Sequence, residues 1–223
     1  MGVVRFLRPT GAEPLGFLSV VPADTREDPG VALRVKVSSC RGGWKEAAML
    51  VLVVGPSGAG KDSLLNGAKA EFRGDPRLVF ARRAITRPPD PYGEDHESIS
   101  AASFATRDFA LSWSAHGLSY GIPAEILTAA PVVVANVSRG TIAQAAALYP
   151  VRVLEVTAPP DILAARLAAR GRETAAGVAR RLTRIATIPA GANVATVLND
   201  GSLEQGVARF VTALRRIVDA AAG

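Results

Sequence analysis

The chain has 223 residues, is 48% hydrophobic and carries a formal net charge of +6. Its length and hydrophobic content are sufficient for one α/β domain with a buried core and argue against a disordered chain. The cationic residues are spread along the sequence without a nucleic-acid-binding signature, so neither the charge nor any motif predicts a nucleic-acid partner. Cys40 is the single cysteine and cannot form an intrachain disulfide, which predicts a cytoplasmic location.

Residues 1 to 48 differ in composition from the remainder of the chain. Glycine and proline are frequent, and only VALRVKV at 31 to 37 alternates as an exposed strand does. The longest apolar run, at 47 to 54, is too short to cross a bilayer, so no membrane partner is expected. We interpret 1 to 48 as an N-terminal extension, either poorly ordered or not native, because Met49 directly precedes the first strand and could be the true start.

From Met49 onward, apolar strands alternate with helical segments, which predicts a domain at 49 to 223. The strands are continuously apolar, as in a parallel sheet that is covered on both faces. The expected strands are 49 to 54, 78 to 85, 131 to 137, 151 to 157 and 192 to 198. The expected helices are 61 to 72, 160 to 170, 174 to 188 and 203 to 222, of which the second and third would form a mobile lid at about 160 to 188. The fold expected is therefore α/β, a doubly wound parallel five-stranded sheet with a helical lid.

The segment GPSGAGKDSLL at 55 to 65 follows the first strand directly and opens a helix. Its glycines allow backbone N–H groups to turn toward an anion, and the helix N-terminus adds a favourable dipole. A lysine after the last glycine reaches the β- and γ-phosphates in loops of this kind, the P-loops. The sequence therefore predicts a P-loop nucleotide site that binds ATP through Gly55, Pro56, Ser57, Gly58, Ala59, Gly60, Lys61, Asp62 and Ser63.

Asp62 stands where a P-loop usually has the Ser or Thr that contacts Mg²⁺. The strand that would supply a partner carboxylate, in VVVANVSRG at 132 to 140, ends without an acid. One hypothesis is that Asp62 faces Mg²⁺ directly or through water, with Ser63 as the nearby hydroxyl. The alternative is that Asp62 only stabilises the helix N-terminus, where acids are favoured. The sequence leaves both open.

A second cluster of candidate residues lies in ARRAITRPPDPYGEDHE at 81 to 97. Arg82, Arg83 and Arg87 could bind the phosphates of an acceptor, because guanidinium groups match phosphate oxygens in pairs. The alternative is that they are solvated arginines on a loop. His96 and His116 are interpreted as turn or surface residues, since neither has a second histidine at metal-ligand spacing.

Several of these motifs, in this order, resemble the guanylate-kinase-like family of nucleoside monophosphate kinases. The resemblance covers about 49 to 223 and rests on GPSGAGK, Thr86-Arg87, Gly93-Glu94, Tyr120-Gly121, ARGRE at 169 to 173, ARRL at 179 to 182 and Asn199-Asp200. Within that family the chain is similar to the ribose 1,5-bisphosphate phosphokinases of phosphonate degradation. That similarity rests on GKDSLL, ITRP, FALSW at 109 to 113, GLSYG at 117 to 121, RGRE and LNDGSL at 198 to 203.

The resemblance implies transfer of the ATP γ-phosphoryl group to the 1-phosphate of ribose 1,5-bisphosphate, giving 5-phospho-α-D-ribose 1-diphosphate (PRPP). It implies Mg²⁺ as cofactor and a nucleoside-monophosphate-kinase-like fold. It assigns catalysis to Lys61, Asp62, Arg87 and Arg172, metal binding to Asp62 and Ser63, additional ATP contacts to Arg170, Asn199 and Asp200, and acceptor contacts to Arg82, Arg83, Arg87, Tyr120 and Arg181.

Departures from the guanylate-kinase pattern favour an acceptor without a base. The glutamate that reads guanine falls on Leu111, which cannot accept hydrogen bonds from a guanine edge, and an acceptor-loop arginine is Asp90 here. A phosphate acceptor with a second pKa of about 6 is already ionised and needs no general base. Two alternatives remain, namely a guanylate or other nucleoside monophosphate kinase, and a non-catalytic guanylate-kinase-like module that binds proteins.

Overall fold

The computed structural model describes residues 48–88, 95–169, 188 and 192–221. The predictions made for the extension at 1 to 47 and for a lid helix starting at 174 lie outside these ranges. None of the helices within them is long and apolar enough to span a membrane.

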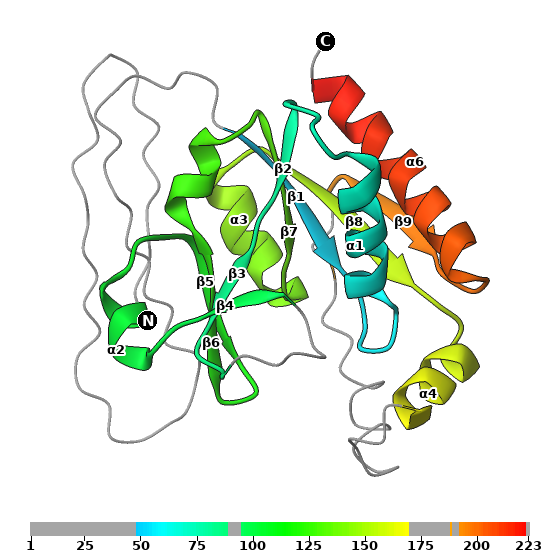
Figure 1. Ribbon diagram of the computed structural model, residues 1–223, viewed down its shortest axis with the longest axis horizontal. Helices are drawn as coiled ribbons and strands as arrows, with labels where there is room; N and C mark the ends of the chain where they lie inside the picture. Colours follow the sequence, from blue (N-terminus) through cyan, green and yellow to red (C-terminus); the bar gives the residue numbers. More distant parts are fainter. Residues whose placement is uncertain (1–47, 89–94, 170–187, 189–191, 222–223) are drawn as a thin grey trace, which may run out of the picture. The chain divides into compact units, whose positions relative to one another are not determined.

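The main sheet has five parallel strands in the order β2-β7-β1-β8-β9 (Figure 1). This arrangement confirms the predicted parallel five-stranded sheet. β1 is central, with Val53 opposite Asn136 of β7 and Val54 opposite Glu155 of β8. The strands are β1 (Met49–Val54), β2 (Leu78–Phe80), β7 (Val132–Asn136), β8 (Val151–Thr157) and β9 (Val194–Leu198).

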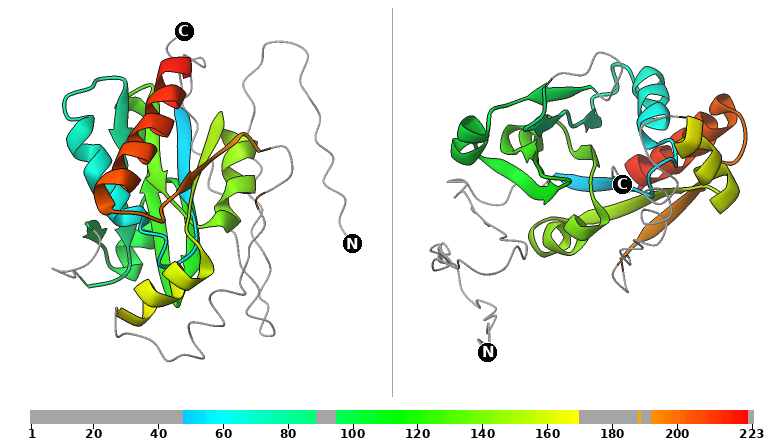
Figure 2. Two further views of the ribbon diagram at one scale, coloured as in Figure 1. Left: turned by 90° about the vertical axis from the view of Figure 1, so that its right-hand side faces the viewer. Right: turned by 90° about the horizontal axis from the view of Figure 1, so that it is seen from below.

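Helices cover both faces of the main sheet, which is why its central strands are apolar throughout. Figure 2 shows α1 (Lys61–Glu71) and α6 (Leu203–Ala221) on one side and α3 (Ile142–Leu148) on the other. Alternate residues of β1 divide between the two buried clusters, Val51 and Val53 with Leu64 and Phe210, and Leu50 and Leu52 with Ile142. The P-loop strand is therefore held by packing on both sides. A further helix, α4 (Pro160–Ala169), follows β8.

A second sheet of four strands, in the order β4-β3-β6-β5, lies beside α2 (Ala101–Thr106) (Figure 1). Its strands are β3 (Arg83–Ile85), β4 (His96–Ser98), β5 (Phe109–Ala115) and β6 (Leu118–Pro123). The chain then makes two short 3-10 helices, η1 (Ala124–Thr128) and η2 (Arg139–Thr141), before and after β7. Leu111 and Ile122 of this sheet pack in the same buried cluster as Leu50 and Leu52, which joins the second sheet to the main one.

The prediction of one strand over 78 to 85 is wrong. Ala81 still donates a backbone hydrogen bond to Val134, but the chain then leaves the main sheet, and β3 pairs with β4 and β6 instead. Arg82 stabilises the departure by pairing with Asp95 at 2.8 Å and donating to the His96 carbonyl at 3.0 Å. The apolar residues on both sides of this break belong to two different sheets, so the hydrophobic pattern did not reveal it.

Arg107 ties the outer elements of the second sheet together. It donates to Glu97 of β4 and to Glu125 of η1, each at 2.6 Å, and its guanidinium lies 5.8 Å from the centre of the Phe109 ring. These hydrogen bonds, which Arg107 donates first of all to Glu97 and then to Glu125, raise the pKa of Arg107. The pKa of the Glu125 carboxyl is lowered, mainly by a hydrogen bond with the backbone of Glu125 itself and then by the hydrogen bond that Arg107 donates. The short strand β4 is thus held by side-chain contacts as well as by its backbone pairing with β3.

Gly67 in the middle of α1 allows that helix to approach α6 closely. A Cβ at this position would meet Cγ2 of Val207 and lie 2.8 Å from its Cγ1. We expect Gly67→Ala to lower the free energy of unfolding by about 1–3 kcal/mol through overpacking, although alanine is the better helix former. Urea denaturation measures this change. Gly67→Ala combined with Val207→Ala should recover part of the loss, and a Gly67→Ala protein more stable than the parent would contradict the close packing.

Candidate active site

The P-loop lies between the end of β1 and the start of α1, at the carboxyl edge of the sheet. Gly60, the residue before α1, has a φ of +87°, a left-handed conformation that favours glycine. Nζ of Lys61 donates to the carbonyl oxygens of Gly55 at 2.9 Å and Pro56 at 3.0 Å. The ammonium group therefore lies across the turn of the loop, where P-loop proteins bind the β- and γ-phosphates. The structure brings these residues together in one loop, and their contacts with ATP stay a prediction.

The carboxylate of Asp62 is contacted by the strand next to β1. Asn136, the last residue of β7, is 8% exposed, and its Nδ2 donates to Oδ1 of Asp62 at 2.8 Å. Val132 and Val134 of β7 pack in the α1-side cluster, so Asn136, two residues further, faces α1 as well. The sequence showed only that an acid is missing at this strand end and did not predict this contact. Ser63, the hydroxyl expected nearby, is exposed on α1.

Asn199 holds the P-loop from its buried side. Its side chain is 5% exposed, and Nδ2 donates to the Ala59 carbonyl at 2.8 Å. Arg166 of α4 donates to the Asn199 carbonyl at 3.0 Å, and a Cβ at Gly58 would lie 3.2 Å from the Leu163 carbonyl of the same helix. Loop, α4 and the end of β9 therefore form one packed unit. Asn199 contacts the loop backbone itself, and its predicted contact with ATP stays a prediction.

Asp200 pairs with a residue of α6. Nη1 of Arg209 donates to Oδ1 of Asp200 at 2.6 Å, and this hydrogen bond lowers the pKa of the Asp200 carboxyl. The carboxylate is thus charged and already engaged, and its predicted ATP contact is likewise untested.

The predicted acceptor residues gather on the second sheet, but with different surroundings. The guanidinium of Arg83 lies 5.6 Å from the centre of the Tyr120 ring, and Tyr120 stacks on Trp113 with ring centres 5.5 Å apart. Arg82 is largely exposed and pairs with Asp95. Nη2 of Arg87 lies 3.4 Å from Nδ1 of His96. The Nε atom of Arg87 is buried and has no hydrogen-bond partner in the described part of the chain. Trp113 belongs to the quoted FALSW motif, but no role was predicted for it.

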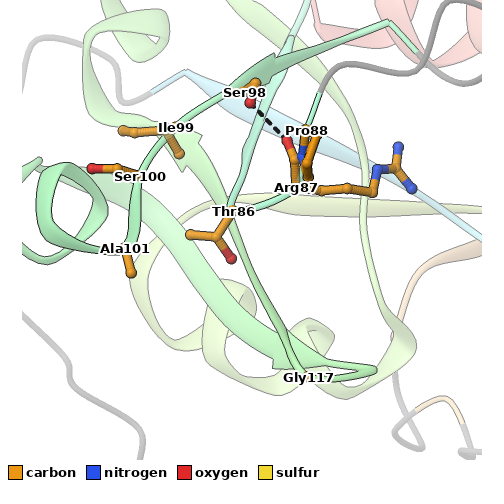
Figure 3. A pocket seen from close by; sticks show the side chains of 8 residues that line it. All are labelled: Thr86, Arg87, Pro88, Ser98, Ile99, Ser100, Ala101 and Gly117. Carbon is orange, nitrogen blue, oxygen red and sulfur yellow. Dashed lines mark hydrogen bonds between the residues drawn. The ribbon is translucent and has the colours of Figure 1, made fainter.

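An open hollow of about 550 Å³ lies beside these residues, and both hydroxyl-bearing and apolar residues line it, the apolar ones being Pro88, Ile99 and Ala101 (Figure 3). Thr86, Ser98 and Ser100 contribute the hydroxyls, and Ser98 donates to the Arg87 carbonyl at 2.7 Å. Figure 3 shows the Arg87 side chain extending away from Ser100 and Ala101. The guanidinium group of Arg87 therefore points away from the hollow, and the backbone of Arg87 borders it.

The remaining predicted residues divide into three groups. Leu111 is 1% exposed and packs in the core, where it cannot read a base. His116 lies in the turn between β5 and β6 as predicted, but the surface prediction for His96 is wrong, because it is 7% exposed within β4. Arg170, Arg172 and Arg181, together with Asp90 and Gly93-Glu94, lie outside the described residues.

An ion pair that the sequence did not reveal lies on the opposite face of β1 from Asp62. Nη2 of Arg139 donates to Oε1 of Glu155 at 2.7 Å, and both side chains are largely buried.

Among the described residues no group of three or more His, Cys, Asp and Glu side chains could hold a metal ion by itself.

The position of Asn199 generates a prediction that separates loop support from ATP contact. Asn199→Ala leaves the buried Ala59 carbonyl without its donor, and we expect the free energy of unfolding without nucleotide to fall by about 1–3 kcal/mol. The affinity for ATP should fall with it, since the loop backbone loses its support. Denaturation in the absence of ATP, with calorimetric titration of ATP, measures both. A residue that only contacts adenine would change the affinity and leave the unliganded stability unaltered.

Comparison with known proteins identifies relatives along most of the chain. It is 55% identical over 173 residues to a ribose 1,5-bisphosphate phosphokinase PhnN of Acidiphilium cryptum, covering 76% of this chain and 94% of the relative. It is 52% identical over 180 residues to a bifunctional ribose 1,5-bisphosphokinase-thymidine phosphorylase of Cupriavidus pinatubonensis, covering 77% of this chain but only 30% of that protein. No family model matches the chain.

The fold has a counterpart among solved structures. A guanylate kinase from Anaplasma phagocytophilum superposes with a TM-score of 0.50 at 14% identity, covering 78% of this chain and 87% of that one, which supports the fold alone. The P-loop at the carboxyl edge of a parallel sheet and the extensive identity to single-function relatives lead to one conclusion. The chain belongs to the ribose 1,5-bisphosphate phosphokinase family, whose members are phosphotransferases.

Proposed function

We propose that this protein transfers the γ-phosphoryl group of ATP to the 1-phosphate of ribose 1,5-bisphosphate, yielding PRPP and ADP in phosphonate catabolism. The observation that carries the proposal is a P-loop with its lysine in place, in a chain 55% identical to a phosphokinase of that name. Leucine rather than glutamate at position 111 also supports an acceptor without a base, because an aliphatic side chain offers no hydrogen bond to guanine.

On the donor side, the residues that would bind ATP are those of the loop and the first turn of α1. Backbone N–H groups and the helix N-terminus stabilise the phosphate charge, and Lys61 would exchange its contacts with the Gly55 and Pro56 carbonyls for phosphate oxygens. Asp62 is an oxygen ligand of the type that Mg²⁺ prefers, and it lies directly after the lysine. Mg²⁺ held there with the nucleotide supplies charge neutralisation at the β- and γ-phosphates.

On the acceptor side, the arginines of the second sheet would position a doubly phosphorylated sugar. Arg87 has a buried Nε without a hydrogen-bond partner in the described residues, and Arg83 lies over Tyr120. A phosphate nucleophile is already ionised near pH 7, so these groups need only orient it in line with the γ-phosphate and screen its charge. We further propose that Arg170, Arg172 and Arg181 close over the transferring group, and that the enzyme acts in the cytoplasm on this small sugar phosphate.

An acceptor panel tests the reaction. With ATP and Mg²⁺, we expect the purified protein to form ADP and PRPP from ribose 1,5-bisphosphate and to leave GMP unphosphorylated. Phosphorus NMR spectroscopy and a coupled enzyme assay follow the products. Lys61→Ala should lower kcat by about 10²–10³-fold, since it removes a preorganised positive charge at the transferring group. Rapid ADP formation with GMP, or ATP binding without turnover of any acceptor, would overturn the proposal in favour of a nucleotide kinase or a binding module.

The role of Arg87 has a test of its own. Arg87→Ala should raise the KM for ribose 1,5-bisphosphate by about 10–100-fold, the loss expected for a hydrogen bond to a charged group, with the KM for ATP little changed. Arg152→Ala is the matched control, because Arg152 is exposed on β8 and, among the residues that the structure describes, donates only to the neighbouring Val151 carbonyl at 3.4 Å. Equal effects of the two substitutions on the acceptor KM would remove Arg87 from the acceptor site.

A further inference from the structure

The contact between Asn136 and Asp62 joins the P-loop helix to the neighbouring strand. The two residues are 74 positions apart in the sequence, and Nδ2 of Asn136 lies 2.8 Å from Oδ1 of Asp62. Asn136 is buried at the end of β7, whereas Asp62 is partly exposed in the first turn of α1. A buried amide thus acts on a carboxylate that solvent and ligands can still reach.

The chemistry of the two groups fixes the direction of this hydrogen bond. A carboxylate only accepts hydrogen bonds, so the NH₂ group of Asn136 must face Asp62. Because Asn136 is buried in the parallel pairing of β7 with β1, its amide has little freedom to turn. The strand end therefore fixes one oxygen of the Asp62 carboxylate and leaves the second oxygen to other partners.

The pair has one charged and one neutral group, as a common P-loop metal site does, but in exchanged places. Such sites combine a neutral hydroxyl after the lysine with a carboxylate at the end of another strand. Here the carboxylate follows the lysine, and a neutral amide ends the strand that pairs with β1. A carboxylate at both positions would place two negative charges within hydrogen-bonding distance, which is unfavourable in the absence of a cation.

We propose that Asn136 is a positioning residue that orients Asp62 toward Mg²⁺, and that loop and strand have exchanged the charged and the neutral member of this site. This inference rests on the proposed kinase function. It differs from a helix-stabilising role of Asp62, which requires an acid in the first turn of α1 and gives Asn136 no part.

The exchange can be reversed in the protein. Asp62→Asn removes the charge, and Asp62→Asn with Asn136→Asp returns it on the strand, with the same two side chains in opposite places. The measurement is calorimetric binding of a non-hydrolysable ATP analogue to the full chain with and without Mg²⁺, and the ratio of the two affinities is the Mg²⁺ enhancement. We expect Asp62→Asn to lower the enhancement by about 10–100-fold, and the double variant to restore most of it.

Two further variants separate positioning from folding and from helix stabilisation. Asn136→Ala keeps the net charge and removes the donor, so the enhancement should fall by about 10-fold. Glu204→Gln removes an exposed acid from the first turn of α6 and should leave the enhancement at its parental value. Thermal unfolding of each variant shows whether it is folded, and Asn136→Ala carries the test if the double variant is not.

The opposite results are equally clear. A double variant that folds but binds with as little enhancement as Asp62→Asn overturns the exchange, and an unchanged enhancement in Asn136→Ala overturns the positioning role. If the parental protein shows the Mg²⁺ enhancement but does not phosphorylate ribose 1,5-bisphosphate, the proposed acceptor fails while the inference about Asn136 stands.

Discussion

Parallel pairing of β1 with β7 on one side and β8 on the other is the constraint on which the site depends. Because all five strands run in one direction, their carboxyl ends meet at one edge, where the P-loop begins. The register then determines which side chains can meet. With Val53 opposite Asn136, the end of β7 comes within hydrogen-bonding distance of the first turn of α1.

The P-loop receives its support from the protein side, which leaves its other side for ligands. Asn199 donates to the Ala59 carbonyl, and before a phosphate binds Lys61 donates to the Gly55 and Pro56 carbonyls. Backbone carbonyl oxygens repel phosphate, so their engagement by donors reduces the negative potential in the loop. The N–H groups and the dipole of α1 then dominate the field that a phosphate group meets. The hydrogen bonds donated to these carbonyl groups therefore make the loop more favourable for anion binding.

Much of this could be predicted from the sequence, and the exceptions have physical reasons. The P-loop and the five parallel strands follow from a specific motif and from long apolar runs. The second sheet did not, because β3 and β4 have three residues each and β4 is anchored by side chains such as Arg107. The sequence showed only that the strand ending at Asn136 lacks an acid, and no contact of Asn136 was predicted. The unusual Asp62 was nevertheless a signal that positions 62 and 136 act in the same site. Arg170, Arg172 and Arg181 carry predictions that depend on the sequence alone.

The second sheet is made from one continuous segment, from Arg83 in β3 to Pro123 in β6, inserted between two neighbouring strands of the main sheet. Three of the residues proposed to bind the acceptor, Arg83, Arg87 and Tyr120, therefore reside in this single stretch of chain, whereas the residues proposed to bind ATP are dispersed over the P-loop, α1 and the segment after β9. A gene segment that encodes these acceptor-binding residues can consequently be exchanged without changing the residues that bind ATP. A replacement of this segment by that of a relative would leave every strand of the main sheet intact, provided that the Leu111 and Ile122 contacts with β1 were kept.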